Sequence, residues 1–227
     1  MSRQLFVWRM ARGHRAGAPC ENTRGHRDAV RAHREISHPE QGRIDYTGAL
    51  DYVFDELSHS RLRLGWGVAN PDLDVRLEEQ IWIEHYRMAC QQYWSLDPET
   101  SHAVGSRHVL CGMLEMSAGD VIFLPKSPDD GHFMVATVKR PYAFDRATVV
   151  DEADVRNDFR HVIGVEDTMR YAYGAGTLYP GIFEAPLRQA IQRISEDDPS
   201  YRTLADFLRS WGKARGLLAH HQVGGSF

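Results

Sequence analysis

The chain has 227 residues, of which 42 % are hydrophobic and 26 % charged, values close to the average for soluble globular proteins. This composition excludes disordered, collagen-like and low-complexity chains. No stretch approaches the roughly 18 uninterrupted apolar residues that a membrane helix requires, and the start of the chain does not have the pattern of a secretory signal. Three cysteines at wide spacings argue against a disulfide framework, so a cytoplasmic location is expected.

Positive charge is concentrated at the start of the chain. The net charge is −4, yet residues 1–38 hold eight arginines against three acidic residues. Of the 27 basic residues, only Lys126, Lys139 and Lys213 are lysines. A GC-rich genome produces such a bias, but the planar donor fork of arginine also suits phosphate groups, and the clustering favours that interpretation.

The first 42 residues predict one strand and a long insert. Leu5–Trp8 has the composition of a strand. Residues 9–42 are polar, with at most a short helix near 28–36. A segment this long without regular structure is often a binding or lid element, so we expect a mobile basic flap here.

Helices and one strand alternate in the next part of the chain. Apolar residues at helical spacing predict a helix over 46–57, with Asp45 or Thr47 as its N-cap. Alternating apolar residues predict a strand over 61–68. Helical spacing returns over 73–92, which is therefore expected to be helical.

A cluster of strands follows a short helix. The helix is expected at 107–116 and the first strand at 121–124. Alternation predicts further strands over 132–139, which Pro141 should end, and over 159–165.

The end of the chain predicts helices. The apolar residues of 187–194 form a helix face, and Asp198-Pro199 is an N-cap signal for a terminal helix. Strands are not regularly separated by helices, so the expected fold is α+β with a small, curved, mostly antiparallel sheet. Residues 1–195 are expected to form one domain, on which a C-terminal helix and tail, 196–227, pack.

The spacing of the residues argues against three kinds of catalytic or metal centre. Histidine is abundant, but no CxxC or HExxH motif occurs. A nuclease centre near Asp129 and Lys139 lacks its second carboxylate, because position 137 is threonine. Cys111 beside His108 has the elements of a thiol–base pair, although a half-buried helical cysteine is commoner. No cofactor, no metal site and no catalytic set are therefore predicted.

Aromatic residues give the strongest functional signal. Trp66 stands between Gly65 and Gly67, and flanking glycines allow close backbone approach and leave an indole face uncovered. Further flat side chains lie beside arginines or in loops: Trp8, Tyr93, Trp94, Tyr142 and Phe144. Such rings can hold an unstacked base. The alternative, that each tryptophan is a core residue, stays open.

Five segments together resemble a known family. They are FVWR, LRLGWG, MSAGDVIFLPK, HFMVATVKRPYAFD and DFRHVIGVE, and they span about residues 3–195 in order. The set is similar to the EVE branch of the PUA-like superfamily, above all to reader domains of modification-dependent restriction systems, which are related in fold to YTH domains. The resemblance implies a small curved β-barrel with helices around it. It also implies a pocket near the first strand and the tryptophan loop for a flipped methylated or hydroxymethylated base.

These observations lead to a prediction of function. The chain is expected to be a non-enzymatic module that binds modified duplex DNA. No nuclease or motor domain is evident in it, so it is expected either to act with a separate nuclease or motor protein or to stand alone. The expected base pocket comprises Trp8, Gly65, Trp66, Gly67 and Trp94. The expected phosphate-binding residues are Arg12, Arg15, Arg24 and Arg27, with Arg160 and His161 at the barrel rim. An RNA-binding PUA-like protein and a histidine-ligated metal hydrolase remain the alternatives.

Overall fold

The computed structural model describes residues 4–8, 44–45, 48–94, 103–125, 127–128, 131–147, 149, 151, 153–173 and 191–194, with Arg202, Leu204, Asp206 and Phe207. The insert predicted at 9–42 lies outside these residues, as does most of the predicted terminal helix. Among the described helices, none has the length and hydrophobicity needed to span a membrane.

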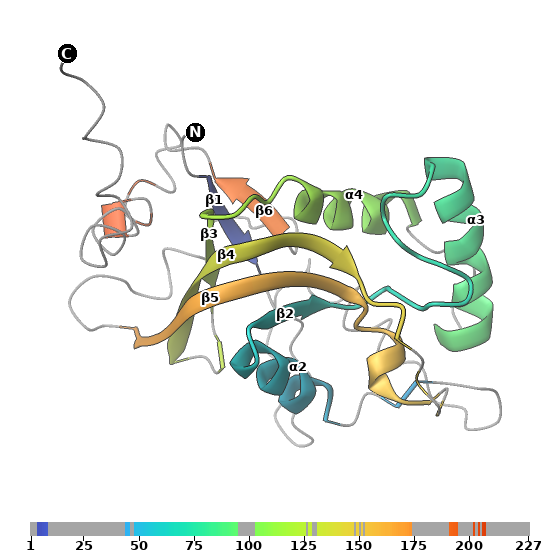
Figure 1. Cartoon of the computed structure of the whole chain (residues 1–227), viewed down its shortest axis with the longest axis horizontal. Helices are drawn as coiled ribbons and strands as arrows, with labels where there is room; N and C mark the ends of the chain where they lie inside the picture. Colours follow the sequence, from blue (N-terminus) through green and yellow to red (C-terminus); the bar gives the residue numbers. More distant parts are fainter. Residues whose placement is uncertain are drawn as a thin grey trace, which may run out of the picture. The chain divides into compact units, whose positions relative to one another are not determined.

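Six strands form one sheet, drawn in Figure 1. The strands are β1 (Leu5–Trp8), β2 (Arg61–Leu64), β3 (Val121–Leu124), β4 (His132–Phe144), β5 (His161–Ala172) and β6 (Ile191–Ile194). Their order across the sheet is β2-β5-β4-β3-β1-β6. β1 pairs in parallel with β3, whereas the β1–β6, β2–β5 and β3–β4 pairs are antiparallel. The predicted α+β class is confirmed, but β2 and β6 end this order, so the described strands form an open sheet and not a closed barrel.

Among the described residues, three α-helices lie between β1 and β3 in the chain. They are α2 (Ala49–Ser58), α3 (Glu79–Ala89), which continues as a π-helical turn at Cys90–Trp94, and α4 (Ala103–Leu114). A short 3₁₀ turn, Val155–Asn157, precedes β5. All three predicted helices in this region exist, with boundaries shifted by a few residues.

Two compact units can be distinguished. Unit 1 comprises Met1–Arg9, Gly119–Thr137 and Asp167–Phe227, and unit 2 comprises Met10–Ala118 and Val138–Glu166. The long strands β4 and β5 contribute residues to both units.

Three strands differ in their bounds from the prediction. The strand predicted over 159–165 is β5, which runs from His161 to Ala172. β2 ends at Leu64 because the chain turns at Trp66, whose φ of 66° lies in the left-handed region and not in the extended region of a regular strand. β4 continues through Pro141 to Phe144. Only Met134–Thr137 of β4 face β3, so beyond Thr137 one edge of the strand has no β3 partner and the missing proline N–H costs no bond of that ladder.

The helix predicted over 187–194 is wrong in its described part. Ile191–Ile194 is a strand that pairs antiparallel with β1, placing Ile194 opposite Leu5 and Ile191 opposite Trp8. Both isoleucines are buried. Their β-branched side chains favour a strand, and pairing with β1 outweighs the helical spacing of the sequence.

The start of α2 differs from the prediction as well. Gly48, with a φ of 79°, precedes the helix, and its N-terminus has no side-chain cap. The predicted cap Asp45 instead forms an isolated bridge with Asp154, donating its N–H to the Ala153 carbonyl at 2.6 Å. Thr47, the other predicted cap, lies outside the described residues.

α3 begins at Glu79, six residues later than predicted. The backbone N–H groups of Asp74 and Arg76 donate to the carboxylates of Asp72 and Asp74, respectively. Each aspartate thus accepts from the residue two positions on, which is the Asx-turn arrangement. Two successive turns therefore occupy the region where the first helical turn was expected.

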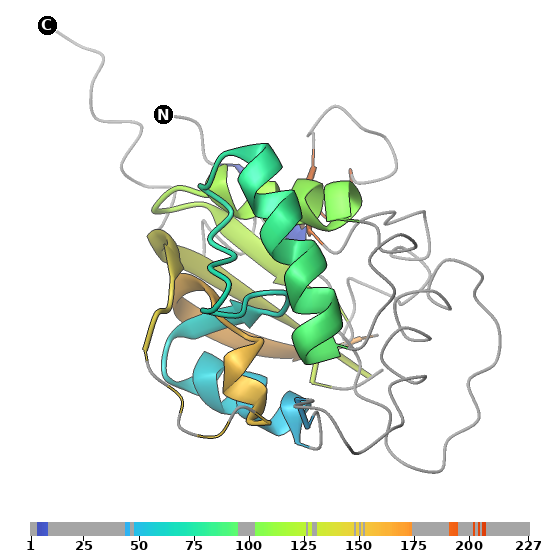
Figure 2. The same ribbon diagram turned by 90° about the vertical axis from the view of Figure 1, so that its right-hand side faces the viewer.

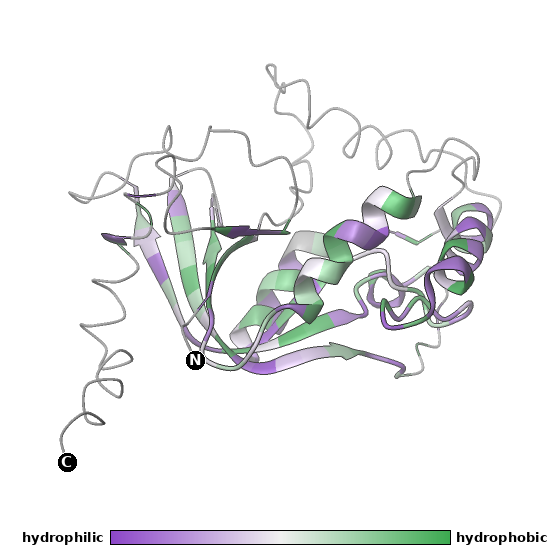
Figure 3. Ribbon diagram, turned by 90° about the horizontal axis from the view of Figure 1, so that it is seen from above, coloured by the Kyte–Doolittle hydropathy of each residue, from purple (hydrophilic) through white to green (hydrophobic). Residues whose placement is uncertain are grey.

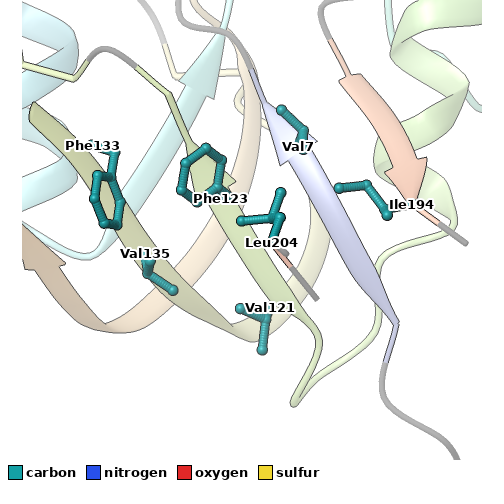
Figure 4. Packing of buried hydrophobic residues seen from close by; sticks show 7 residues of the cluster. All are labelled: Val7, Val121, Phe123, Phe133, Val135, Ile194 and Leu204. Carbon is teal, nitrogen blue, oxygen red and sulfur yellow. The ribbon is translucent and has the colours of Figure 1, made fainter. Parts of the chain in front are cut away.

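A compact aromatic and aliphatic cluster forms the core of unit 1. Figure 4 shows seven of its residues: Val7, Val121, Phe123, Phe133, Val135, Ile194 and Leu204. The Phe133 ring is central, with centroid distances of 5.2 Å to Phe123, Tyr171 and Tyr173 and 5.5 Å to Phe207. Residues from three separate parts of the chain thus pack around one ring.

The buried face of α3 supplies aromatic packing in unit 2. Helix α3 faces the viewer in Figure 2, and its polar and apolar residues alternate along it in Figure 3. Trp82 stacks on Tyr86 at 5.1 Å, and Tyr86 contacts Trp94 at 5.3 Å. The Trp82 indole N–H donates to the Leu73 carbonyl, and the Tyr86 hydroxyl lies 3.2 Å from that of Ser106. Trp82, Tyr86 and Trp94 are therefore core residues.

Phe133→Ala should lower the free energy of unfolding by about 3–5 kcal/mol, because it removes the ring against which four other rings pack. Phe133→Leu, which keeps most of the apolar volume, should cost clearly less. Urea unfolding monitored by circular dichroism measures both changes. Equal losses for the two variants would contradict the central role of this ring.

Candidate functional site

The Gly65-Trp66-Gly67 turn follows β2 and is held by one buried carboxylate. The N–H groups of Trp66 and Gly67 lie 2.7 and 3.3 Å from Asp158 Oδ1, and the Gly67 N–H also donates to the Asp158 carbonyl at 2.9 Å. Asp158 is 1 % exposed. Because its carboxylate accepts from the turn itself, the backbone at Trp66 is fixed independently of the indole.

The two glycines are required by close packing. A Cβ at Gly65 would lie 2.7 Å from Asp158 Oδ2, and one at Gly67 would lie 2.9 Å from His161 Cδ2. The sequence predicts close backbone approach here, and the structure identifies what is approached. The Trp66 residue itself is half-buried.

Arg63 holds the end of β2 that leads into this turn. Its guanidinium is buried, with Nε donating to Glu56, Nη1 to the Phe159 carbonyl at 2.8 Å and Nη2 to Asp145 at 2.8 Å. Hydrogen bonds from Arg61 and Arg63 hold the pKa of Glu56 below its usual value against the effect of burial. This arginine thus joins β2 to helix α2, to the residue that follows β4 and to the segment that precedes β5.

His161 lies beneath the turn and is fully buried. Its Nε2 is 3.1 Å from the Trp66 carbonyl oxygen and its Nδ1 is 2.9 Å from the Tyr142 hydroxyl. A carbonyl only accepts, so Nε2 carries a proton. Burial lowers the pKa of His161 to about 4, so the ring is neutral at pH 7 and Nδ1 accepts from Tyr142.

The Tyr142 hydroxyl links His161 to Asp74. It lies 3.2 Å from Asp74 Oδ1, and the Val75 N–H approaches it at 3.4 Å. The hydroxyl has one proton, which it donates in a hydrogen bond to Nδ1 of the neutral His161. Asp74 must therefore obtain its other donors elsewhere.

Two arginines provide those donors. Arg76 donates from Nη2 to Asp74 Oδ2 at 2.5 Å, and Arg146 donates to the same oxygen at 2.9 Å and to Asp72 Oδ2 at 2.8 Å. Burial opposes ionisation of Asp74, but the hydrogen bonds from Arg76 and Arg146 outweigh it and hold the pKa of this carboxyl well below its usual range. We name Arg76 and Arg146 the arginine pair.

The arginine pair lies over aromatic rings. The Arg76 guanidinium is 5.4 Å from the centroid of Tyr142, and that of Arg146 is 5.1 Å from the centroid of Phe144. Both distances are within the range of cation–π attraction. Both arginine side chains are 52 % exposed, whereas Asp74 is 4 % exposed. The pair is thus anchored from beneath and open to solvent.

The two other predicted pocket tryptophans lie in packed interiors. Trp8 is fully buried in β1 of unit 1. Trp94 is 2 % exposed and packs on Tyr86 in unit 2. Neither presents a free ring face, so for these two the alternative of a core role fits the structure.

Arg160 and His161 do not lie at a rim. Arg160 is 3 % exposed and donates to the carbonyls of Asn157, Asp145 and Ala147 and to the side chain of Asn157. Its donors are directed to the protein itself, which corrects the predicted phosphate-binding position. Arg12, Arg15, Arg24 and Arg27, the other predicted phosphate-binding residues, lie outside the described residues.

Sequence reasoning missed Asp158 and the arginine pair. The local pattern Asp72-x-Asp74-x-Arg76 was the one signal that could have drawn attention to the pair. Arg146 is 74 positions from Asp72, and Asp158 is 92 positions from Trp66, so no spacing rule brings them together.

The described residues offer little for metal binding or for thiol catalysis. It contains no group of three or more His, Cys, Asp or Glu side chains placed to hold a metal ion. Cys111 is half-buried on α4, and burial raises its pKa, which opposes thiolate formation.

Comparison of the chain with protein-family models, curated proteins and solved structures finds no match in any of the three.

His161 should make stability pH-dependent. Its pKa is about 4 in the folded protein and about 6.5 in an unfolded chain, so between these values only the unfolded state binds the proton. Stability is complete above pH 6.5 and should fall by about 2 kcal/mol between pH 7 and pH 5 from this group. Urea unfolding at the two pH values measures the loss.

The matched variants are His161→Gln and, on an exposed turn, His59→Gln. The first should lack most of the loss between pH 7 and pH 5, and the second should keep it. A full loss in His161→Gln would assign the effect to other groups.

Gly67→Ala should destabilise the protein by about 1–3 kcal/mol, because the new methyl group meets the buried His161 ring and Arg160 Cβ at 2.9 and 3.1 Å. Gly105→Ala, on an exposed position of α4, is the control and should be neutral or stabilising. Thermal unfolding distinguishes the two variants. An unchanged melting temperature for Gly67→Ala would show that the turn can shift away from His161.

Proposed function

We propose that the chain is a nucleic-acid-binding module that recognises a modified base by drawing it out of the duplex and stacking it on Trp66. One observation carries the proposal. A partly exposed indole stands on a turn whose backbone is locked by Asp158 and His161, and hydrogen bonds connect that turn through His161 to Tyr142, whose ring lies beneath Arg76 of the solvent-exposed arginine pair. A flat ring beside fixed guanidinium groups is the combination that bases and phosphates require.

The energetics favour a preorganised ring. Extruding a base costs a few kcal/mol, and one aromatic stack returns about 1–3 kcal/mol. Since the turn at Trp66 is already ordered, little further backbone entropy is lost when a base binds. A methyl group adds only about 0.8 kcal/mol, which is less than a tenfold preference. Selectivity for a modification therefore needs hydrogen bonds or steric exclusion as well.

The resemblance to the EVE branch of the PUA-like superfamily supports this proposal. Its five segments lie on five consecutive strands of the sheet order: LRLGWG on β2 and the turn, DFRHVIGVE on β5, HFMVATVKRPYAFD on β4, MSAGDVIFLPK on β3 and FVWR on β1. We propose a PUA-like fold on this basis, and modified duplex DNA as the favoured ligand. A separate nuclease or motor protein would then act on the DNA that the module marks.

Trp66→Ala should abolish discrimination between modified and unmodified duplexes of one sequence. Loss of one stack should weaken binding of the modified duplex roughly tenfold to a hundredfold. The salt dependence of binding should not change, because that term reports phosphate contacts. Fluorescence anisotropy with duplexes that carry methylcytosine, hydroxymethylcytosine, methyladenine or no modification measures both quantities.

Trp66→Phe is the matched control and should keep part of the preference, since it retains an aromatic face. Both variants preserve the backbone bonds to Asp158 and should fold, which circular dichroism tests. Unchanged discrimination by a folded Trp66→Ala would exclude Trp66 as the stacking residue. A preference for structured RNA over every duplex would favour the RNA-binding alternative, and no binding to either at low salt would refute the proposal.

A further inference from the structure

We propose that the arginine pair, Arg76 and Arg146, binds one phosphate group of the nucleic-acid backbone. The inference rests on the proposed function only in taking nucleic acid as the source of the phosphate. It assigns backbone binding to described residues of unit 2 that the sequence did not single out.

The first supporting feature is the proximity of the two guanidinium groups. The Nη2 atoms of Arg76 and Arg146 lie 2.5 and 2.9 Å from the same oxygen, Asp74 Oδ2. The two guanidinium groups therefore lie side by side over one carboxylate, as they would have to on one phosphate. Arg146 also donates from Nε and Nη2 to Asp72. Neither guanidinium group can therefore turn freely.

The second feature is the set of donors left over. In both arginines the carboxylates occupy Nε and Nη2. Among the described residues, no hydrogen bond is made by Nη1 of either one. Each Nη1 carries two protons, so the pair retains up to four donors for an incoming anion.

The third feature is preorganisation. Tyr142 and Phe144 lie beneath the guanidinium planes and are 8 % and 7 % exposed, so they form a fixed floor. An arginine ordinarily loses side-chain entropy when it binds phosphate, and here most of that freedom is already lost in the free protein. Planar, fixed forks suit the bidentate recognition of phosphate oxygens.

The carboxylates set the expected strength of the site. Asp72 and Asp74 balance the charge of the two arginines, so a small free anion gains little from the net field. The turn at Trp66 is connected to the pair through His161 and Tyr142, so a base that stacks on Trp66 would hold a phosphate of the same strand close to the pair, and that phosphate needs less intrinsic affinity. The pair should therefore contribute clearly to oligonucleotide binding and only weakly to binding of inorganic pyrophosphate.

Arg156 provides a matched control in the same unit. It is 59 % exposed and makes the same kind of paired contact with an aspartate, donating from Nε and Nη2 to Asp154. It differs in standing apart from the arginine pair and its aromatic floor. If exposure and a carboxylate partner sufficed, Arg156 would bind phosphate as well.

The experiment compares Arg76→Gln, Arg146→Gln and Arg156→Gln in the full chain. Anisotropy with an unmodified and a modified duplex over a range of salt concentrations gives the affinity and the salt slope. Inorganic pyrophosphate, added as a competitor, tests the phosphate group alone. Arg76→Lys and Arg146→Lys are included because they keep a charge beside the buried Asp74 if a glutamine variant fails to fold.

Each substitution in the pair should weaken binding of both duplexes equally, by about three- to tenfold, and lower the salt slope by about 0.9 for one phosphate contact. The double variant should lose no more of the slope than either single one, because one phosphate is shared. The lysine variants should fold and still bind more weakly than wild type. The ratio of modified to unmodified affinity should stay unchanged, as should all binding by Arg156→Gln.

Wild-type affinity and slope in folded Arg76→Gln and Arg146→Gln would overturn this proposal and leave the role of Trp66 intact, as would wild-type affinity in the lysine variants if the glutamine variants do not fold. An effect of Arg156→Gln as large as that of the pair would show general charge attraction and overturn it too. Wild-type protein that binds pyrophosphate but no nucleic acid would refute both proposals.

Discussion

The buried carboxylate of Asp158 is the contact on which the candidate site depends. It accepts the N–H of Trp66 at 2.7 Å, and the Gly67 N–H donates both to this carboxylate and to the Asp158 carbonyl. A buried N–H left without an acceptor costs about 1–3 kcal/mol. It also lies so close to Gly65 that no side chain fits there. The direction in which the chain leaves β2, and hence the place of the indole, follows from this one acceptor.

The sequence predicts which segments form strands better than it predicts where the strands end. Short apolar runs such as Leu5–Trp8 and Val121–Leu124 have few alternatives to being strands, and both are strands. The alternation over 61–68 fails at Trp66, because hydropathy carries no information about a positive φ. Ile191–Ile194 fails for another reason, since four residues fit a helix and a strand equally and the pairing with β1 decides.

The candidate site was predictable only in its local part. Glycines on both sides of Trp66 indicate a close approach, but the groups that they approach lie more than 90 positions away. Alternation predicts Arg160 on a strand, but β5 begins at His161, and the burial of Arg160 depends on carbonyls that only the folded chain brings together. The arginine pair depends on a contact across 74 positions and on two aromatic rings beneath it. These are tertiary properties, and a single sequence does not encode them in any short pattern.

The single hydroxyl proton of Tyr142 has a consequence for the surface of the protein. His161 Nε2 donates its proton to the Trp66 carbonyl, so Nδ1 of the neutral ring accepts a hydrogen bond from the Tyr142 hydroxyl. Asp74 lies within 3.2 Å of the same hydroxyl but does not receive its proton. Asp74 accepts from both members of the arginine pair, so the hydrogen bonding of the buried His161 and Tyr142 is linked to two guanidinium groups at the surface.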